Sequence, residues 1–223
     1  MKSGGSGNTM RKVISFCIFG NNPKYTQGAI ENAMMAPHIY PDWECRFYVG
    51  NDVEQEVKDQ LLKYNGVVID RDSAGWDSTF WRFEPISDPT VDVFISRDTD
   101  SRLNYRERRA VDEWLSSGKP LHIMRDHPYH GYAVLAGMWG FRGTIEGDLT
   151  TLVQDYISKS GRNDYYQVDQ DFLRDVIYAN FKEMSCIHDE FFDKTKWPTE
   201  RAPGEYVGSP WVDGKLEIPF VSK

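Results

Sequence analysis

The sequence has few cysteines and no long apolar run. Its three cysteines, Cys17, Cys45 and Cys186, are odd in number and widely spaced, which excludes both a disulfide framework and a CxxC metal site. No apolar stretch approaches the roughly 18 residues of a membrane span, and no signal-peptide pattern is visible. These absences predict a protein with no membrane span and with buried free thiols. Such thiols suit a reducing compartment, and we expect a cytoplasmic location.

Positive charge is also in short supply. Lys and Arg number 26 against 34 Asp and Glu, which gives a formal net charge of −8. A chain this acidic has no general attraction for nucleic-acid phosphates or anionic membrane surfaces, so we expect no nucleic-acid partner. A phosphate-bearing ligand would have to be held locally, by a metal ion or by a few placed basic groups. The composition is otherwise that of a folded domain, with 40% apolar and 27% charged residues.

The order of the predicted elements indicates one α/β domain. Residues 1–10 (MKSGGSGNTM) are typical of a flexible linker or a cloning remnant, which leaves residues 11–223 for the fold. Apolar runs predict strands over 13–19, 46–49 and 66–70, and helical spacing predicts helices over 25–40 and 53–64. Alternating strands and helices favour a doubly wound, Rossmann-like domain with a mostly parallel sheet. No GxGxxG follows the first strand, so a nicotinamide-dinucleotide site is not supported.

The second half of the chain continues the pattern. A short helix is predicted over 78–84 and a fourth strand over 91–96. A helix over 105–115 begins after Asn104, has Glu107 at the capping-box position and ends at Gly118. Further strands are predicted over 121–124 and 135–141, and further helices over 149–160 and 168–181. The remaining C-terminal residues are punctuated by Pro and Gly, and we expect them to wrap back over the sheet.

The segment 97–101 (RDTDS) carries the strongest chemical signal. Asp98 and Asp100 follow the apolar strand 91–96, and ligands of open α/β sheets bind outside the carboxyl ends of the strands. Two carboxylates at i and i+2 of an extended segment project to the same side. A divalent cation would neutralise them and gain hard oxygen ligands. The alternative is a loop whose acids pair with Arg97 and Arg102 or cap the next helix.

Three further polar groups are candidates. Asp169 and Gln170 begin the helix 168–181, where they either complement the helix dipole or bind sugar hydroxyls and face an anomeric carbon. His188 is either a structural histidine or the nitrogen ligand of a mixed Mn²⁺ site with the two aspartates. The polar turn 125–130 (RDHPYH) either lines the acceptor side of a site or is an ion-paired turn.

Taken in order, these segments resemble the GT-A-fold nucleotide-sugar glycosyltransferases. The series is the first strand 14–19, WRF at 81–83, RDTDS at 97–101, AGMWG at 136–140 and DQD at 169–171. The chain has features of the glycogenin-like group. It is also similar, over roughly residues 11–208, to the smaller glycosyltransferases of large algal viruses that glycosylate capsid protein. The resemblance implies a single GT-A domain, with a mostly parallel central sheet flanked by helices, and for a viral enzyme a location in the host cytoplasm.

The resemblance implies a metal site. Asp98 and Asp100, with Thr99 between them, match the motif that holds Mn²⁺ (or Mg²⁺) against the diphosphate of a UDP-sugar. His188 matches the C-terminal histidine ligand of glycogenin-like enzymes. The Gly-x-x-Lys-Pro-Trp segment that follows this histidine in those enzymes is absent, and only KTKWP at 194–198 lies nearby.

The resemblance also assigns residues to the nucleotide-sugar donor. Arg82 matches a basic residue that reaches the donor sugar or phosphate, and Asp169 and Gln170 match the segment that faces the donor sugar and are the catalytic candidates. The loop after the first strand matches the part that holds nucleobase and ribose, through Phe19, Gly20 and Asn22.

The function that follows is a metal-dependent transfer of a hexosyl or deoxyhexosyl group from a UDP-sugar to a carbohydrate or glycoprotein acceptor. One alternative is a phosphatase of the haloacid-dehalogenase type, which also places DxD after an apolar strand. That pattern requires DxDx(T/V) near the N-terminus, whereas 97 residues precede Asp98 here and Ser101 follows Asp100. Another alternative is a non-catalytic sugar- or nucleotide-binding module in which the two aspartates bind structural Ca²⁺.

Overall fold

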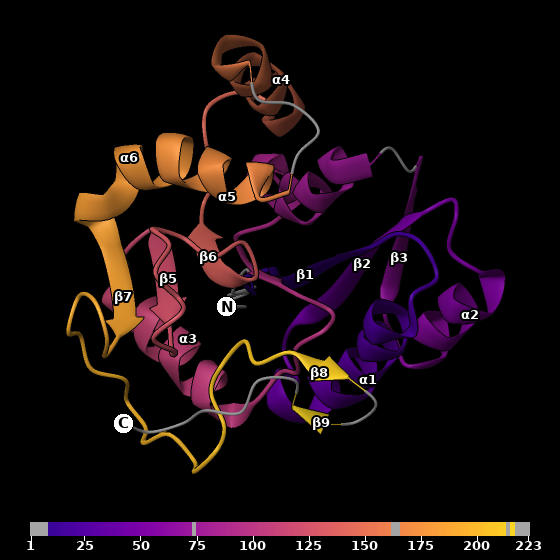
Figure 1. The fold of residues 1–223 in the computed structure, drawn as a ribbon, viewed down its shortest axis with the longest axis horizontal. Coiled ribbons are helices and arrows are strands. Elements are labelled where there is room, and N and C mark those ends of the chain that lie inside the picture. The colour runs from indigo at the N-terminus through magenta and orange to yellow at the C-terminus, as the bar shows by residue number, and fades with distance from the viewer. Residues whose placement is uncertain (1–8, 73–74, 162–165, 213–214, 217–223) are drawn as a thin grey trace, which may run out of the picture.

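A seven-stranded sheet forms the centre of the protein (Figure 1). The structure, a computed structural model, describes residues 9–72, 75–161, 166–212 and 215–216. The strands are β1 (Lys12–Ile18), β2 (Glu44–Gly50), β3 (Val67–Arg71), β4 (Val93–Arg97), β5 (Leu121–Arg125), β6 (Met138–Arg142) and β7 (Ser185–Asp189), in the order β3-β2-β1-β4-β6-β5-β7. Strand β6 runs antiparallel to both of its neighbours, and all other pairs are parallel. The predicted mostly parallel sheet is confirmed.

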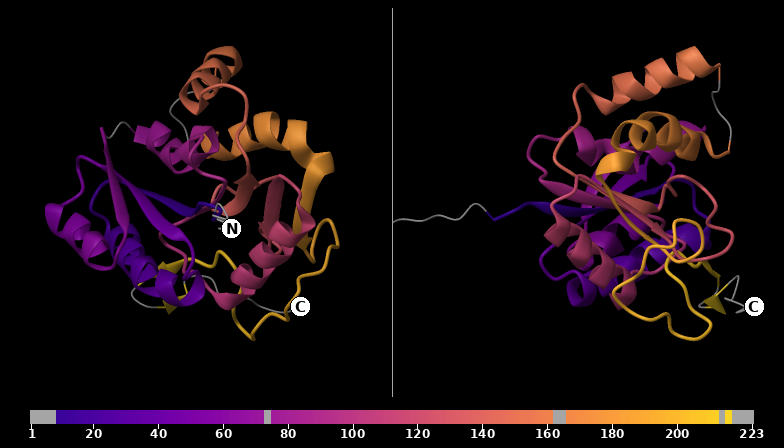
Figure 2. Two further views of the ribbon diagram at one scale, coloured as in Figure 1. Left: turned by 180° about the vertical axis from the view of Figure 1, so that it is seen from behind. Right: turned by 90° about the vertical axis from the view of Figure 1, so that its left-hand side faces the viewer.

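Helices cover both faces of this sheet (Figure 2). One face packs against α1 (Pro23–Ile39), α2 (Gln55–Lys63) and α3 (Tyr105–Ser117). The other packs against the 3-10 helix η1 (Gly75–Ser87), α4 (Leu149–Ser160) and α5 (Val168–Phe172). In the described ranges, no helix is both long and apolar enough to cross a bilayer.

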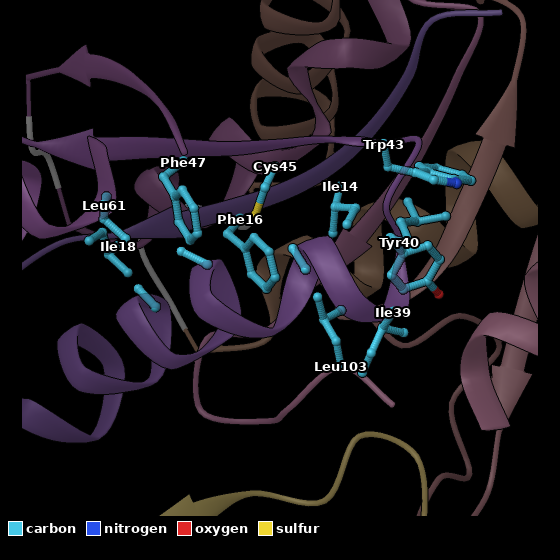
Figure 3. Close-up of a cluster of buried hydrophobic side chains, with 14 of the residues drawn as sticks. Ile14, Phe16, Ile18, Ile39, Tyr40, Trp43, Cys45, Phe47, Leu61 and Leu103 are labelled. Atoms are coloured by element: carbon cyan, nitrogen blue, oxygen red, sulfur yellow. The ribbon is translucent and has the colours of Figure 1, made fainter. Parts of the chain in front are cut away.

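The core under α1 shows why the first strand is so apolar (Figure 3). Ile14, Phe16 and Ile18 of β1 are at most 1% exposed and point toward this helix, while Val13 is buried on the opposite face. The rings of Phe16 and Phe47 stack with centroids 5.0 Å apart. Each such side chain contributes about 1.5–3 kcal/mol through burial. A strand buried on both faces has no room for polar alternation, which explains the continuous apolar run.

Local signals fix the ends of the helices. The Asn22 side chain accepts a hydrogen bond from the Lys24 N–H at the start of α1 (3.0 Å), and Asn104 accepts one from the Glu107 N–H at the start of α3 (2.9 Å). Helix α3 ends at Gly118, whose φ of +70° lies in the left-handed region that favours glycine. The start predicted for α3 and its glycine terminator are confirmed.

Some predicted boundaries are wrong. The single helix predicted over 168–181 is divided into α5, a π-helical segment η2 (Leu173–Tyr178) and α6 (Ala179–Phe181), followed by the 3-10 turn η3 (Lys182–Met184). The strand predicted over 135–141 begins only at Met138. Residues 135–137 form a loop, where the Ser96 hydroxyl donates to the Ala136 carbonyl (2.7 Å).

The sequence analysis does not predict the last strands. Strand β7 mixes polar and ionisable side chains, and the two-residue strands β8 (Trp211–Val212) and β9 (Lys215–Leu216) are too short to show periodicity. The segment between β7 and β8 turns back to the strand ends. The Val207 N–H donates to the Asp126 carboxylate (2.8 Å), and the Trp211 N–H donates to the Asp100 carbonyl (2.7 Å).

Candidate functional site

A cavity of about 620 Å³ lies at the carboxyl ends of β1 and β4. Open α/β sheets bind their ligands at this edge. The cavity walls come from the loop after β1, helix η1, the loop after β4, the residues before β6 and the start of α5. Every candidate residue except His188 lines this cavity: Phe19, Gly20, Asn22, Arg82, Asp98, Thr99, Asp100, Asp169 and Gln170. The structure brings them together, and what they bind stays a prediction.

The loop after β4 is held rigidly against α1. The buried Asn32 side chain donates to the Ser101 carbonyl (2.8 Å) and accepts from the Leu103 N–H (3.0 Å). Gly28 faces the same loop, and a Cβ there would lie 1.9 Å from the Thr99 carbonyl oxygen. Only glycine allows this approach of helix and loop, so the two aspartates of the loop are presented on a fixed backbone.

A buried arginine bridges two acids of the cavity. Arg82 is 7% exposed, and its Nη1 donates to Asp98 Oδ1 while its Nη2 donates to Asp169 Oδ2 at 3.0 Å. Burial opposes the charge of this guanidinium, but Asp98 and Asp169 outweigh it and raise the pKa of Arg82 above its ordinary value. The side chain therefore remains a cation that couples the DxD segment to the start of α5.

Asp100 is held differently from Asp98. Lys24, at the start of α1, places its Nζ 3.7 Å from Asp100 Oδ2. Burial and the neighbouring charge of Asp98 raise the pKa of Asp100 to about 6. On its other side, Asp98 packs on Gly137, where a Cβ would lie 2.1 Å from Asp98 Oδ2. Together with Asp169, these carboxylates carry three negative charges against the two positive charges of Arg82 and Lys24.

This donor set fits a divalent cation that is also bound by a substrate. Magnesium-type sites use one or two carboxylates together with substrate phosphate oxygens, and Asp98 and Asp100 supply two carboxylates. A cation would relieve the repulsion that raises the pKa of Asp100. Within the described residues, no three or more Asp, Glu, His or Cys side chains are grouped so as to hold a metal by themselves. A cation at this point would therefore need ligands other than the described side chains.

His188 does not join the two aspartates. It lies in β7, 1% exposed, and its ring bonds to His122 (2.8 Å) and Glu113 (3.0 Å). Strand β7 is separated from β4 by β6 and β5, a distance of about 14 Å at the ordinary strand spacing. The structure therefore does not bring His188 together with Asp98 and Asp100, although the resemblance implies that it should.

Other residues of the cavity were not among the predicted site residues. They include Cys17, Tyr25, Tyr166, Gln167 and Gly208, and Lys24 accompanies them through its contact with Asp100. His130 also lines the cavity and comes from the candidate polar turn 125–130. A usable signal existed for Lys24 and Tyr25, since they follow the carboxyl end of β1, where ligands of α/β sheets bind. Gly208, in contrast, reaches the cavity through a C-terminal segment with no regular pattern.

The sheet order and the cavity at its carboxyl edge define the GT-A fold, the class expected from the resemblance. Galactosyltransferase LgtC, solved in complex with donor and acceptor sugar analogues, is similar over 80% of this chain and 73% of its own, with 16% identity and a TM-score of 0.52. The mannosyltransferase PcManGT of Pyrobaculum calidifontis, solved with GDP-Man and Mn²⁺, is similar over 82% and 56%, with 7% identity and a TM-score of 0.52. No protein-family model and no curated protein sequence matches the chain.

Proposed function

We propose that this protein is a metal-dependent glycosyltransferase that transfers a sugar from a UDP-sugar to a carbohydrate or glycoprotein acceptor. One observation carries the proposal: in a GT-A fold, the acids Asp98, Asp100 and Asp169 meet the buried cation Arg82 in one cavity of about 620 Å³. A cavity of this size is typical of small-molecule sites. The solved structures with the same fold support it, since one was obtained with donor and acceptor sugar analogues and another with GDP-Man and Mn²⁺.

Asp98 and Asp100 would hold the metal, Mn²⁺ or Mg²⁺. When bound, it supplies Lewis-acid stabilisation of the charge that develops on the leaving diphosphate. Burial and the charge of Asp98 raise the pKa of Asp100, and this cost of two buried carboxylates supports a cation between them and the donor. A cation bound in the cavity would also offset the repulsion between a chain of net charge −8 and an anionic donor.

The chain's own cations and polar groups would orient the donor. Arg82 lines the cavity and Lys24 contacts Asp100 at its wall, so both would offer positive charge to the diphosphate. Asp169 and Gln170 line the same cavity as the DxD loop. Asp169 would accept hydrogen bonds from hydroxyls of the donor sugar, and the Gln170 amide could also donate to them. The nucleoside would lie against the loop after β1, through Phe19, Gly20 and Asn22.

A thermal-shift screen tests the proposal directly. The protein is heated with UDP, GDP and representative nucleotide-sugars, each with Mn²⁺ and with a chelator. A ligand that binds only the native state raises its stability, so we expect stabilisation by UDP and a UDP-sugar when Mn²⁺ is present and none when it is chelated. If no nucleotide stabilises the protein with metal, the proposal is wrong.

The two alternatives make different predictions in the same assay series. A haloacid-dehalogenase-type phosphatase would use Asp98 as nucleophile and would hydrolyse a simple phosphomonoester, an activity lost in Asp98→Asn. The ion pair of Asp98 with Arg82 argues against this role, because it lowers the nucleophilicity of the carboxylate. A non-catalytic module would bind a UDP-sugar tightly yet neither transfer nor hydrolyse it.

A further inference from the structure

The loop between β5 and β6 brings His130 into the wall of the cavity. Its Nδ1 accepts a hydrogen bond from the Asp126 backbone N–H at 2.9 Å. Asp126 is itself fully buried, and its carboxylate is bonded by Arg106 (2.8 Å) and Arg201 (2.7 Å). The backbone that holds the imidazole is therefore fixed by two charge-assisted contacts from α3 and the C-terminal segment.

This hydrogen bond determines what the ring offers to the cavity. A neutral imidazole has one N–H and one acceptor nitrogen, and because Nδ1 accepts from Asp126, the proton lies on Nε2. Burial and the neighbouring His127 lower the pKa of His130 to about 4, so the ring is uncharged at neutral pH. His130 consequently offers a neutral Nε2–H donor and no free lone pair, which excludes it as a general base at that nitrogen.

His130 lies on the side of the cavity away from the loop proposed to hold the nucleoside, which is the side where we expect a sugar. In the sheet order, β5 lies on the opposite side of β4 from β1, so His130 and the nucleoside loop around Phe19 flank Asp98 from opposite sides. The loop of His130 is joined to the start of α5 by a hydrogen bond from Gln167 Nε2 to the Tyr132 hydroxyl (2.7 Å).

Exposed aromatic rings surround the same loop. Tyr129 is 78% exposed and Tyr132 is 38% exposed, and Phe192, 47% exposed, lies against Gly131, where a Cβ would be 3.5 Å from its ring. Exposed aromatic clusters beside a polar site mark a binding surface more often than chance. Their apolar faces suit the C–H faces of a sugar ring.

We propose that His130 is a sugar-recognition residue whose Nε2–H donates a hydrogen bond to a hydroxyl of the carbohydrate bound in the cavity. An uncharged donor matches a neutral hydroxyl, whereas the diphosphate is matched by Arg82, Lys24 and a metal. The inference rests on the proposed function. The hydroxyl belongs either to the sugar of the donor or to the acceptor, and the experiment separates the two sources.

Two substitutions isolate the donor nitrogen. His130→Gln keeps an N–H near the position of Nε2, and His130→Phe keeps a ring without a donor. The matched control is His127→Phe, because His127 has the same kind of contact, Nδ1 accepting from the Tyr129 N–H at 3.0 Å. Unlike His130, His127 is not among the described residues that line the cavity. Thermal unfolding of all three variants establishes that the fold is intact.

Calorimetry with Mn²⁺ measures the affinities of UDP and UDP-glucose. We expect UDP to bind all variants as it binds the wild type. If the donor sugar is the partner, His130→Phe binds UDP-glucose several-fold to about tenfold more weakly, the value of one neutral hydrogen bond, and His130→Gln recovers most of the loss. His127→Phe should match the wild type with both ligands.

If UDP-glucose binding is unchanged in His130→Phe, the acceptor is the partner. Saturation-transfer NMR with maltose, lactose and cellobiose, in the presence of UDP and Mg²⁺, should then give a signal with the wild type that His130→Phe loses and His130→Gln retains. The inference is overturned if His130→Phe weakens UDP itself, or if neither UDP-glucose nor any of the disaccharides distinguishes it from the wild type. Failure of the wild type to bind UDP at all would instead overturn the proposed function.

Discussion

Replacing Asp100 by asparagine should make the metal-free protein more stable while it removes a predicted metal ligand. Asp100 is largely buried, its side chain is 21% exposed, and Lys24 is no closer than 3.7 Å. Burial and the charge of Asp98 raise its pKa from the usual 3.8 to about 6, so the folded protein holds the ionised carboxylate unfavourably. Asparagine has nearly the same shape and carries no charge, so it removes this cost.

The size and sign of the effect follow from the pKa. The rise in the pKa of Asp100 from 3.8 to about 6 corresponds to about 3 kcal/mol of stability, at about 1.36 kcal/mol for each pKa unit. The folded carboxyl binds its proton more tightly than the unfolded one, so wild-type stability falls as pH rises from 3.8 to about 6 and stays lower above that. The Asp100→Asn variant has no carboxyl at this position, so this part of the fall in stability with pH is absent from it. The variant should exceed the wild type by about 3 kcal/mol at pH 7.5, or roughly 6–12 °C in Tm, and by little near pH 4.

The assay is chemical and thermal unfolding of both proteins with a chelator, at pH 7.5, 6 and 4.5. Asp169→Asn is the matched control, because it makes the same chemical change in the same cavity but removes a partner of the buried Arg82 at 3.0 Å. It should be destabilised by about 2–3 kcal/mol. The reasoning is refuted if Asp100→Asn is no more stable than the wild type at pH 7.5, or if its advantage does not shrink as the pH falls.

Three further outcomes are expected. Gly137→Ala places a Cβ 2.1 Å from Asp98 Oδ2 and should abolish Mn²⁺-dependent UDP binding in calorimetry while the protein remains folded; unchanged affinity would contradict the packing argument. Asp126→Asn removes the fully buried carboxylate shared by the half-buried Arg106 and Arg201 and should cost about 3 kcal/mol in urea unfolding, with faster proteolysis of the C-terminal segment. Burial raises the pKa of Cys17 to about 11, so iodoacetamide at pH 8 should modify it, as read by peptide mass spectrometry, only after unfolding in urea.

The sequence predicts those parts of the site that depend on short-range rules. The apolar runs of β1 and β4 identify buried parallel strands, and the position of Asp98 and Asp100 directly after β4 places them at the ligand edge of the sheet. The capping residue Asn104 and the terminator Gly118 likewise follow from chemistry within one helical turn.

The parts that escape prediction depend on long-range pairing. Whether His188 reaches the two aspartates depends on which strand β7 joins, and no local pattern shows that it pairs with β5 at the sheet edge. The ion pair of Arg82 with Asp169 joins residues from η1 and α5, which come together only when both pack on the same face. The π-helical segment Leu173–Tyr178 has the apolar spacing of an ordinary helix, so the sequence cannot distinguish the two.

The C-terminal segment is the last part of the cavity to be synthesised. It is bonded to the loop after β4 through Trp211 and to the loop after β5 through Asp126, and it contributes Gly208 to the cavity. All seven strands of the central sheet precede this segment in the chain, so the last wall of the cavity is synthesised after the sheet. A nascent or truncated chain ending before residue 206 would have the sheet without the complete pocket. A ligand that binds only the complete pocket would therefore protect chains in which this segment has docked.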